Sequence, residues 1–238
     1  MTKELMIGIL GGMGPEATVN CFAKIINNTP AQCDQEHLKI IVANNPKIPD
    51  RTSAILNSGT SPIPNLLESV DALVSAGVDF IIIPCVTVHY FVDELLQSRD
   101  VKILSILDAV TENIRNVHPQ IDTVGLLATD GTIASKIFQK RLAASGIKTV
   151  VCSDSMQQQV MKAIYQIKTD SKAGSQAEIT RHLVDASNSL VSHGAQGIIA
   201  GCTEIPLALT QEDIEVPYFD SLLILARTAI AYAGRKPV

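Results

Sequence analysis

Short hydrophobic runs alternate with longer amphipathic segments along the whole chain. The amphipathic segments place apolar residues three and four positions apart, as helices do, and several end at a glycine; residues 64–77 are an example. The runs between them are typical of buried parallel strands, and they predict strands at 5–12, 37–46, 80–85, 102–107, 123–129, 148–153 and 197–202. Strands that alternate with helices predict the α/β class, with parallel sheets covered on both faces.

The remaining segments complete this pattern. Residues 49–65 contain the longest irregular stretch, which we expect to be a functional loop. Residues 90–98 and 135–146 are each expected to form one helix. Residues 216–221 are expected to lead into a last helix that packs on the first half of the protein.

The second half of the chain repeats the first. Residues 73–85 (LVSAGVDFIIIPC) match residues 190–202 (LVSHGAQGIIAGC) at a constant offset of 117 positions. The same offset aligns residues 7–14 with residues 124–131. A duplicated sequence of this kind predicts two halves with the same local fold.

We therefore expect two pseudo-symmetric lobes, each with a roughly four-stranded parallel sheet flanked by helices. The repeat places Cys85 and Cys202 at equivalent positions of these lobes. The expected lobes are 1–108 plus 215–238, and 109–214.

Composition and charge narrow the function classes. The net charge is −5 and the basic residues are scattered, so the chain lacks the basic stripe of a nucleic-acid-binding protein. No stretch approaches the roughly 18 apolar residues of a membrane span, and the N-terminus lacks the apolar region of a signal peptide. The odd number of cysteines then favours a cytoplasmic protein with reduced thiols, in which we interpret three as packing or surface residues: Cys21, Cys33 and Cys152.

Cys85 and Cys202 each follow a predicted strand, at the edge where open parallel sheets bind ligands. A thiol at a helix N-terminus feels the positive end of the helix dipole, so we expect a lowered pKa and an accessible thiolate. Two opposed, equivalent proton carriers are what a racemase needs, because inversion removes a proton from one face of a carbon and returns one to the other. Polar residues accompany both cysteines: Thr87, His89, Thr203 and Glu204.

Several separated motifs, spread over nearly the whole chain, resemble the aspartate/glutamate racemase family. They are GGMGP (11–15), NPKIPDR (45–51), PCVTVH (84–89), GLLATDGT (125–132) and GCTEIPL (201–207). The resemblance implies two four-stranded α/β lobes, an active site in the cleft between them and a homodimer. It also implies catalysis without pyridoxal phosphate, metal or nucleotide, so no cofactor is expected.

The resemblance also implies roles for individual residues. Cys85 as thiolate removes the Cα proton of one enantiomer while Cys202 as thiol returns a proton, and the reverse reaction exchanges these roles. Arg51 holds a substrate carboxylate and Lys168 is a second cation, which fits an acidic amino acid, first aspartate and otherwise glutamate. His89 is expected to tune a thiol. Further substrate contacts are expected from Met13, Gly14, Val86, Thr87, Thr129, Thr132, Thr203 and Glu204.

One position departs from the family pattern. The family usually has asparagine after the first cysteine, in PCNTxH, whereas this chain has Val86. Asparagine donates hydrogen bonds to a carboxylate and valine does not. Loss of one such bond to a charged group costs about 1.5–3 kcal/mol, or roughly ten- to a hundredfold in affinity.

Other functions compete with a racemase. The two cysteines, with His89 and Glu204, have the side chains of a zinc site but lack a recognised spacing. GGMGP is glycine-rich like a nucleotide-binding loop, and Cys85 with His89 has the components of a cysteine hydrolase. A related thiol-dependent isomerase of another small acid and a non-catalytic ligand-binding homologue also remain, and so does the interpretation of Arg51 as a loop residue paired with Asp50.

Overall fold

The computed structural model describes residues 4–169 and 176–238 and divides the chain into two compact units. The first comprises the chain up to Ala109 together with Leu222–Val238, and the second is Val110–Ser221. Two helices cross the boundaries between them, α5 (Ile106–Val117) and α10 (Ser221–Tyr232).

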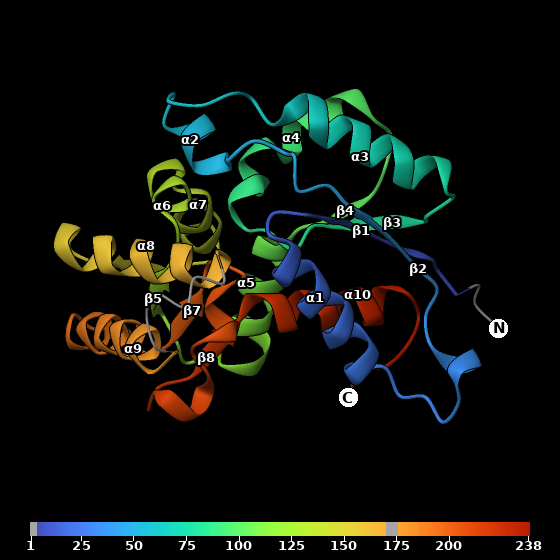
Figure 1. Cartoon of the computed structure of the whole chain (residues 1–238). Coiled ribbons are helices and arrows are strands. Elements are labelled where there is room, and N and C mark those ends of the chain that lie inside the picture. Colours follow the sequence, from blue (N-terminus) through green and yellow to red (C-terminus); the bar gives the residue numbers. More distant parts are fainter. Residues whose placement is uncertain (1–3, 170–175) are drawn as a thin grey trace. The chain divides into compact units, whose positions relative to one another are not determined.

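The first unit is built on a four-stranded parallel sheet with the order β2-β1-β3-β4. Its strands are β1 (Ile7–Gly11), β2 (Ile40–Asn44), β3 (Phe80–Ile82) and β4 (Ile103–Leu104). Every residue of β1 and β3 is buried, because helices cover both faces. In Figure 1, α1 and α10 lie on one face of this sheet and α3 on the other. The remaining elements of the unit are α1 (Pro15–Asn28), η1 (Asp34–Glu36), α2 (Arg51–Ile55), α3 (Ile63–Ser75), η2 (Thr87–Phe91) and α4 (Val92–Ser98).

The second unit has the same sheet order, β6-β5-β7-β8, and all its strands are parallel. Its strands are β5 (Thr123–Leu127), β6 (Lys148–Val151), β7 (Ile198–Ala200) and β8 (Tyr218–Asp220). Helix α9 packs on β5 and on α8, and α7 packs on β6. The other elements are α6 (Asp130–Ser135), α7 (Ile137–Ala143), α8 (Asp154–Lys168), α9 (Gln176–Ser192), η3 (Ile205–Leu207) and η4 (Gln211–Asp213).

The sequence repeat is also a repeat of strand register. In the first sheet Gly8 is paired with Ile81, and in the second Gly125 is paired with Ile198. Both pairs are related by the offset that aligns the two cysteines. The predicted α/β class, with two four-stranded parallel sheets flanked by helices, is confirmed.

The structure differs from the sequence predictions in several places. The strand expected at 102–107 is only Ile103–Leu104, because α5 already begins at Ile106. Residues 216–221 contain β8, which pairs with β7 and so belongs to the second unit, whereas the sequence analysis places residues 215–238 in the first lobe. The helix expected over residues 135–146 is shorter, since α7 covers only Ile137–Ala143. Ser135 instead ends the separate helix α6, because Lys136 adopts a left-handed conformation with φ 56° between the two. The expected loop at 49–65 contains the short helix α2.

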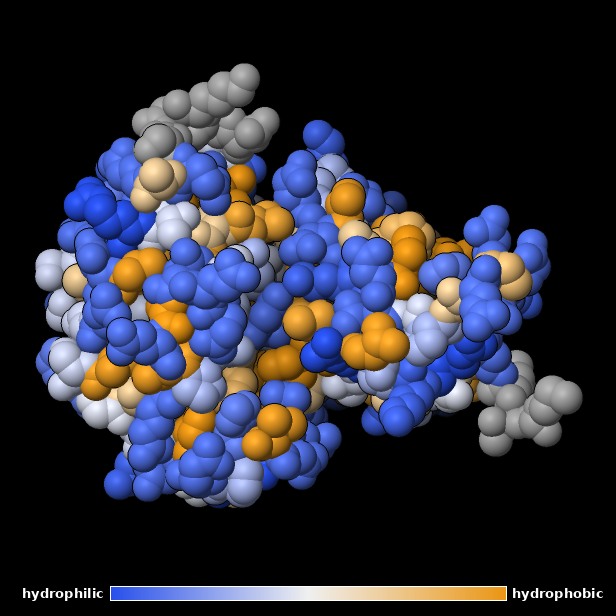
Figure 2. Space-filling model, turned by 90° about the horizontal axis from the view of Figure 1, so that it is seen from below, coloured by the Kyte–Doolittle hydropathy of each residue, from blue (hydrophilic) through white to orange (hydrophobic). Residues whose placement is uncertain are grey.

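Hydrophilic side chains predominate on the face drawn in Figure 2, and hydrophobic side chains form separate patches among them. Exposed apolar groups of this kind are ordinary on folded proteins. Within residues 4–169 and 176–238, no helix combines the length and the hydropathy needed to cross a membrane.

Candidate active site

Cys85 lies three positions beyond the end of β3, in the segment that leads into η2. Its side chain is 5% exposed and belongs to the hydrophobic cluster of the first unit. The next residue, Val86, is 1% exposed and precedes the 3-10 turn. Thr87 is also buried. The first cysteine motif is therefore an ordered, buried strand end.

His89 holds this strand end through both of its ring nitrogens. Nδ1 lies 2.8 Å from the Cys85 carbonyl oxygen, and Nε2 accepts the backbone N–H of Ile106 at 3.2 Å. This pattern requires a neutral imidazole with its proton on Nδ1. Burial lowers the pKa of His89 to about 4, against the opposing effects of backbone hydrogen bonds and Asp108. Because the ring bonds to the backbone and not to the Cys85 sulfur, the arrangement does not support a cysteine-hydrolase dyad.

The buried neutral His89 predicts a loss of stability in mild acid. A histidine whose pKa falls from 6.5 to about 4 on folding binds fewer protons in the native state than in the unfolded state. Its contribution is therefore complete above pH 6.5 and is lost as the pH falls toward 4, by up to about 3 kcal/mol. Urea unfolding at pH 7 and pH 4.5 should show this loss in the wild type and a smaller loss in His89→Gln. The exposed His193 supplies the control His193→Gln, which should behave as the wild type; equal acid sensitivity of all three proteins would contradict the account.

The glycine loop after β1 approaches the backbone of the neighbouring strand closely. Gly12 has φ +98°, and a Cβ atom there would lie 2.3 Å from the carbonyl carbon of Asn45, so only glycine fits. Thr18 of α1 fixes the loop, because its hydroxyl accepts from the Gly12 N–H and donates to the Gly14 carbonyl, both at 2.9 Å. The sequence prediction named Met13 and Gly14 but missed Thr18, whose only signal is its place in the helix after the loop.

Arg51 is a buried cation without an acidic partner in the described part of the chain. Its side chain is 7% exposed, and Nη1 donates to the carbonyl oxygens of Ile48 and Pro49 at 3.2 and 3.0 Å. Nη2 reaches the Met13 carbonyl at 3.4 Å, which connects Arg51 to the glycine loop, and Nε has no hydrogen-bond partner among the described residues.

The alternative in which Arg51 pairs with Asp50 is not what the structure shows. The Asp50 carboxylate accepts the Ser53 N–H at 2.8 Å and so caps α2. A buried guanidinium with carbonyl neighbours keeps its full positive charge, and such a charge is costly unless an anion meets it. Arg51 is therefore suited to binding an anionic ligand.

Cys202 lies two positions beyond β7, and its side chain is likewise 5% exposed. Its Sγ–H donates to Glu204 Oε2 at 3.0 Å, and the Thr203 hydroxyl donates to the same oxygen at 3.4 Å. Lys168 Nζ, at the end of α8, lies 3.8 Å from Glu204 Oε1. The second unit thus brings three of the predicted site residues, Cys202, Thr203 and Lys168, around the buried carboxylate of a fourth, Glu204.

The expected lowering of the Cys202 pKa is wrong. Burial raises the pKa of this thiol well above its usual value and the Glu204 carboxylate raises it further, while Lys168 acts in the opposite direction. Desolvation and a neighbouring negative charge both disfavour a thiolate, and here they outweigh any stabilisation by exposed backbone amides. The contact with Glu204 therefore favours the thiol form of Cys202 over the thiolate.

Thr129 and Thr132 form the start of α6. Thr129 caps the helix by accepting the Thr132 N–H at 3.2 Å, and the two hydroxyls lie 3.1 Å apart. Gln157 of α8 supports this turn by donating to the Ala128 carbonyl at 3.0 Å and to Asp130 Oδ1 at 2.8 Å. The sequence prediction missed Gln157, because a glutamine within a helix carries no distinctive signal.

The zinc alternative finds no support inside either unit. Over the ranges that the structure describes, no group of three or more histidine, cysteine, aspartate or glutamate side chains is arranged to hold a metal ion.

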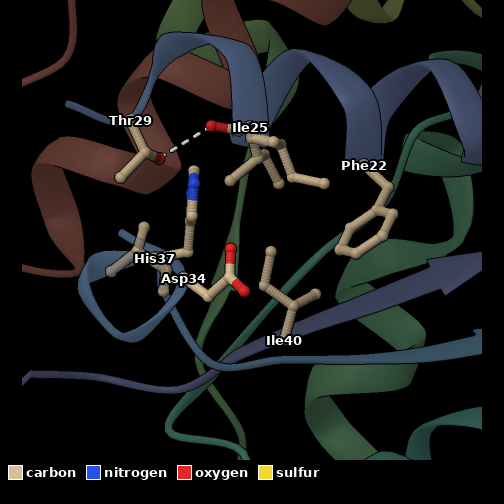
Figure 3. A pocket seen from close by; sticks show the side chains of 8 residues that line it. Phe22, Ile25, Thr29, Asp34, His37 and Ile40 are labelled. Atoms are coloured by element: carbon tan, nitrogen blue, oxygen red, sulfur yellow. Dashed lines mark hydrogen bonds between the residues drawn. The ribbon is translucent and has the colours of Figure 1, made fainter. Parts of the chain in front are cut away.

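A pocket of about 310 Å³ in the first unit is separate from these residues. Figure 3 shows Phe22 and Ile25 of α1, Asp34, His37 and Ile40 pointing into it. Ile40 begins β2, whereas Cys85 follows the carboxyl end of β3. Because the strands are parallel, the pocket lies at the amino ends of the strands and Cys85 lies at their carboxyl ends. Its lining includes neither a cysteine nor an arginine, so we do not assign the reaction to it.

Two parallel sheets of the same order, each with a buried cysteine just beyond its third strand in chain order, define a duplicated α/β protein with a thiol at the equivalent strand end of each half. The chain belongs to the Asp/Glu/Hydantoin racemase family, whose model matches residues 10–229. The predicted family resemblance is thereby confirmed.

Individual relatives agree with this assignment. The chain is 30% identical over 238 residues to the broad specificity amino-acid racemase RacX of Bacillus subtilis, covering 95% of this chain and 97% of the relative. The solved structure of Picrophilus torridus aspartate racemase is similar with a TM-score of 0.87 and 28% identity, covering 98% of this chain and 96% of that one. An aspartate racemase homologue from Pyrococcus horikoshii has a TM-score of 0.75 and 27% identity, with 99% and 100% covered.

Proposed function

We propose that this protein is an amino-acid racemase in which Cys85 and Cys202 exchange protons with the substrate Cα without a cofactor. The observation that carries the proposal is the equivalent placement of the two thiols. Each follows the third strand of a sheet with the same order, and each is 5% exposed. If the reaction used only one of these cysteines, the equivalent position in the other half would be free to change after the duplication. That both halves keep a cysteine there supports a reaction that needs two thiols.

In the proposed reaction one sulfur acts as base and the other as acid. The thiolate takes the Cα proton, the electron pair remains on the carbanion that forms, and the second thiol donates its proton to the opposite face. The Cα proton is only weakly acidic, so the carbanion needs electrostatic stabilisation by groups around the substrate carboxylate. Arg51 fits that task, because it is a buried cation without an acidic partner among residues 4–169 and 176–238.

Aspartate, and otherwise glutamate, is the first substrate class to test. Arg51 and Lys168 supply two cations for two carboxylates, and the Picrophilus torridus relative is an aspartate racemase. We propose further that Met13, Gly14, Thr87, Thr129, Thr132 and Thr203 provide hydroxyls and amides for the substrate.

One observation favours a broader substrate range as a second candidate. Lys168 is already close to Glu204, at 3.8 Å, so part of its charge is neutralised within the protein. Arg51 alone then provides an unneutralised cation for the α-carboxylate, which all amino acids share. The 30% identity to a broad specificity amino-acid racemase points the same way.

The proposed function is tested by Cα proton exchange. The purified protein is incubated in D2O, without added cofactor, with single enantiomers of aspartate, glutamate, alanine, methionine and lysine. Deuterium at Cα together with loss of optical rotation is the expected result for aspartate. Fastest exchange with neutral or basic amino acids would favour the second candidate, and absence of exchange across the panel would reject the racemase.

Val86 provides a prediction about substrate affinity. An asparagine in this 1% exposed position would have an amide that bulk water does not reach, so a substrate carboxylate would be its best partner. Val86→Asn is therefore expected to lower KM for aspartate by about ten- to a hundredfold. Val86→Ala, which adds no hydrogen-bonding group, is the control for the change of shape. A KM that is unchanged or raised in Val86→Asn would count against this role.

A further inference from the structure

The two cysteines differ in the charge beside the sulfur, although they are equally buried. Cys202 donates to Glu204 Oε2 at 3.0 Å, and Glu204 itself is 2% exposed. Around Cys85 the described residues place no carboxylate in hydrogen-bond contact with the sulfur, and the ring of His89 bonds to the Cys85 backbone carbonyl. The duplication has thus kept the thiols and made their surroundings unequal.

The surroundings of Cys202 determine where its proton stays. Among the residues that the structure describes, the charged groups that act on this thiol are Glu204 and Lys168. Glu204 is in direct hydrogen-bond contact with the sulfur, whereas Lys168 reaches the far carboxylate oxygen at 3.8 Å. The negative charge is therefore the nearer of the two, and it opposes removal of the proton from sulfur.

On the basis of the proposed function, we infer that Glu204 is a positioning residue that holds the proton on Cys202 in the free enzyme. Glu204 thereby determines which of the two enantiomers the free enzyme can racemise first. The free enzyme then carries a proton donor at Cys202, so in the proposed reaction that starts from this form Cys85 is the sulfur that takes the substrate proton. Only the enantiomer whose Cα proton faces Cys85 finds the enzyme in the required form.

The proton balance gives this inference a consequence. After one turnover Cys85 holds the proton taken from the substrate, and Cys202 has given its proton to the product. The enzyme returns to its resting form when Cys85 loses one proton to solvent and Cys202 gains one from solvent. Glu204 favours that return, because its carboxylate destabilises the thiolate left at Cys202 and accepts a hydrogen bond from the restored thiol.

Alkylation by iodoacetamide measures the resting proton without any turnover, because only a thiolate reacts at a useful rate. The rate at each cysteine is followed from pH 6 to 10 by mass spectrometry of the corresponding peptides. In Glu204→Gln the alkylation curve of Cys202 should move by at least about one pH unit to lower pH, which is about tenfold faster reaction at neutral pH. Cys85, with the same exposed fraction, is the internal standard and its curve should not move.

A second variant gives a shift of opposite sign. Lys168→Met removes the cation that partly neutralises Glu204, so alkylation of Cys202 should become slower than in the wild type. Thr203→Val keeps the carboxylate and removes only the hydroxyl that donates to it at 3.4 Å, so it serves as the matched control. A variant that exposes the site by loosening the fold would speed alkylation at both cysteines, and thermal unfolding of each variant identifies that case.

The inference is supported if Glu204→Gln speeds and Lys168→Met slows alkylation of Cys202 alone. It is overturned if the Cys202 curve is the same in Glu204→Gln and the wild type, or if both variants shift it in the same direction. Failure of the racemase proposal is a different result, namely no Cα exchange with any amino acid by the wild type. The labelling experiment does not depend on turnover, so the two failures are separable.

Discussion

Replacing Cys202 by serine is expected to lower kcat/KM for racemisation about 10³- to 10⁴-fold in both directions, the upper part of the range for positioned acid–base groups. A serine hydroxyl is a much weaker acid than a thiol and forms no useful concentration of its anion. Both directions should fail together, because each direction needs one sulfur to take a proton and the other to give one. Cys85→Ser should have the same effect. Initial rates from each pure enantiomer, measured by chiral chromatography, provide the test.

The remaining cysteines supply matched controls. Cys33 is exposed and Cys152 is partly exposed, and neither was assigned a role, so their serine variants should keep wild-type activity. A β-chloro amino acid separates loss of one sulfur from loss of the fold, since elimination needs only one base. The thiolate takes the Cα proton, the electron pair forms the Cα–Cβ double bond and chloride leaves. Each single variant should therefore eliminate chloride from one enantiomer, and full racemase activity in Cys202→Ser would disprove the two-thiol scheme.

Replacing Arg51 by methionine is expected to produce the second large effect, a rise of KM with the fold retained. Truncation of one member of a buried charge pair costs about 2–5 kcal/mol, or roughly 30-fold to several thousandfold in affinity. Without substrate, the same guanidinium is a buried charge whose Nε finds no hydrogen-bond acceptor in the part of the chain that the structure describes. The thermal stability of Arg51→Met should therefore be equal to or above that of the wild type while substrate binding is lost.

Arg99 provides the control for removing an arginine from the same unit. It is paired with Asp71 and its side chain is 38% exposed, so Arg99→Met should leave KM unchanged. Arg51→Lys keeps the charge but not the two-pronged geometry, and its KM should fall between those of the wild type and Arg51→Met. An equal KM in Arg51→Met and Arg99→Met would remove Arg51 from the proposed substrate site.

The fold was predictable where the chain repeats itself. The offset that aligns Cys85 with Cys202 also aligns the paired residues of the two sheets, because strand order and register depend on the buried runs that the repeat preserves. β8 was missed because its three residues directly precede a helix, which leaves too short a run to show a strand period. The break at Lys136 was missed because a left-handed conformation at lysine has no sequence signal.

The sequence suggests which residue types make up the candidate site, but it predicts little about their hydrogen bonds and the directions of their pKa shifts. The sequence proposes Arg51 and the two cysteines as site residues, but the carbonyl neighbours of Arg51 depend on the bend of a loop that no periodicity describes. The expected thiolate at Cys202 rested on a general effect of helix termini. The structure instead shows a specific hydrogen bond from Cys202 to Glu204, two residues away. Whether the Glu204 side chain points toward the sulfur depends on the folded turn and cannot be predicted from sequence.

The central claim, that two different sulfurs act on one Cα, is tested most directly by the position of deuterium in the first few per cent of a reaction started in D2O from one pure enantiomer. The product enantiomer and the remaining substrate are separated by chiral chromatography, and the Cα deuterium content of each is measured by mass spectrometry. If one sulfur removes the proton and the other returns one from its own exchanged thiol, the product enantiomer is fully deuterated and the remaining substrate still carries protium. Product that retains the substrate's protium, or substrate that gains deuterium as fast as the product, would show that a single base serves both faces and would contradict the account.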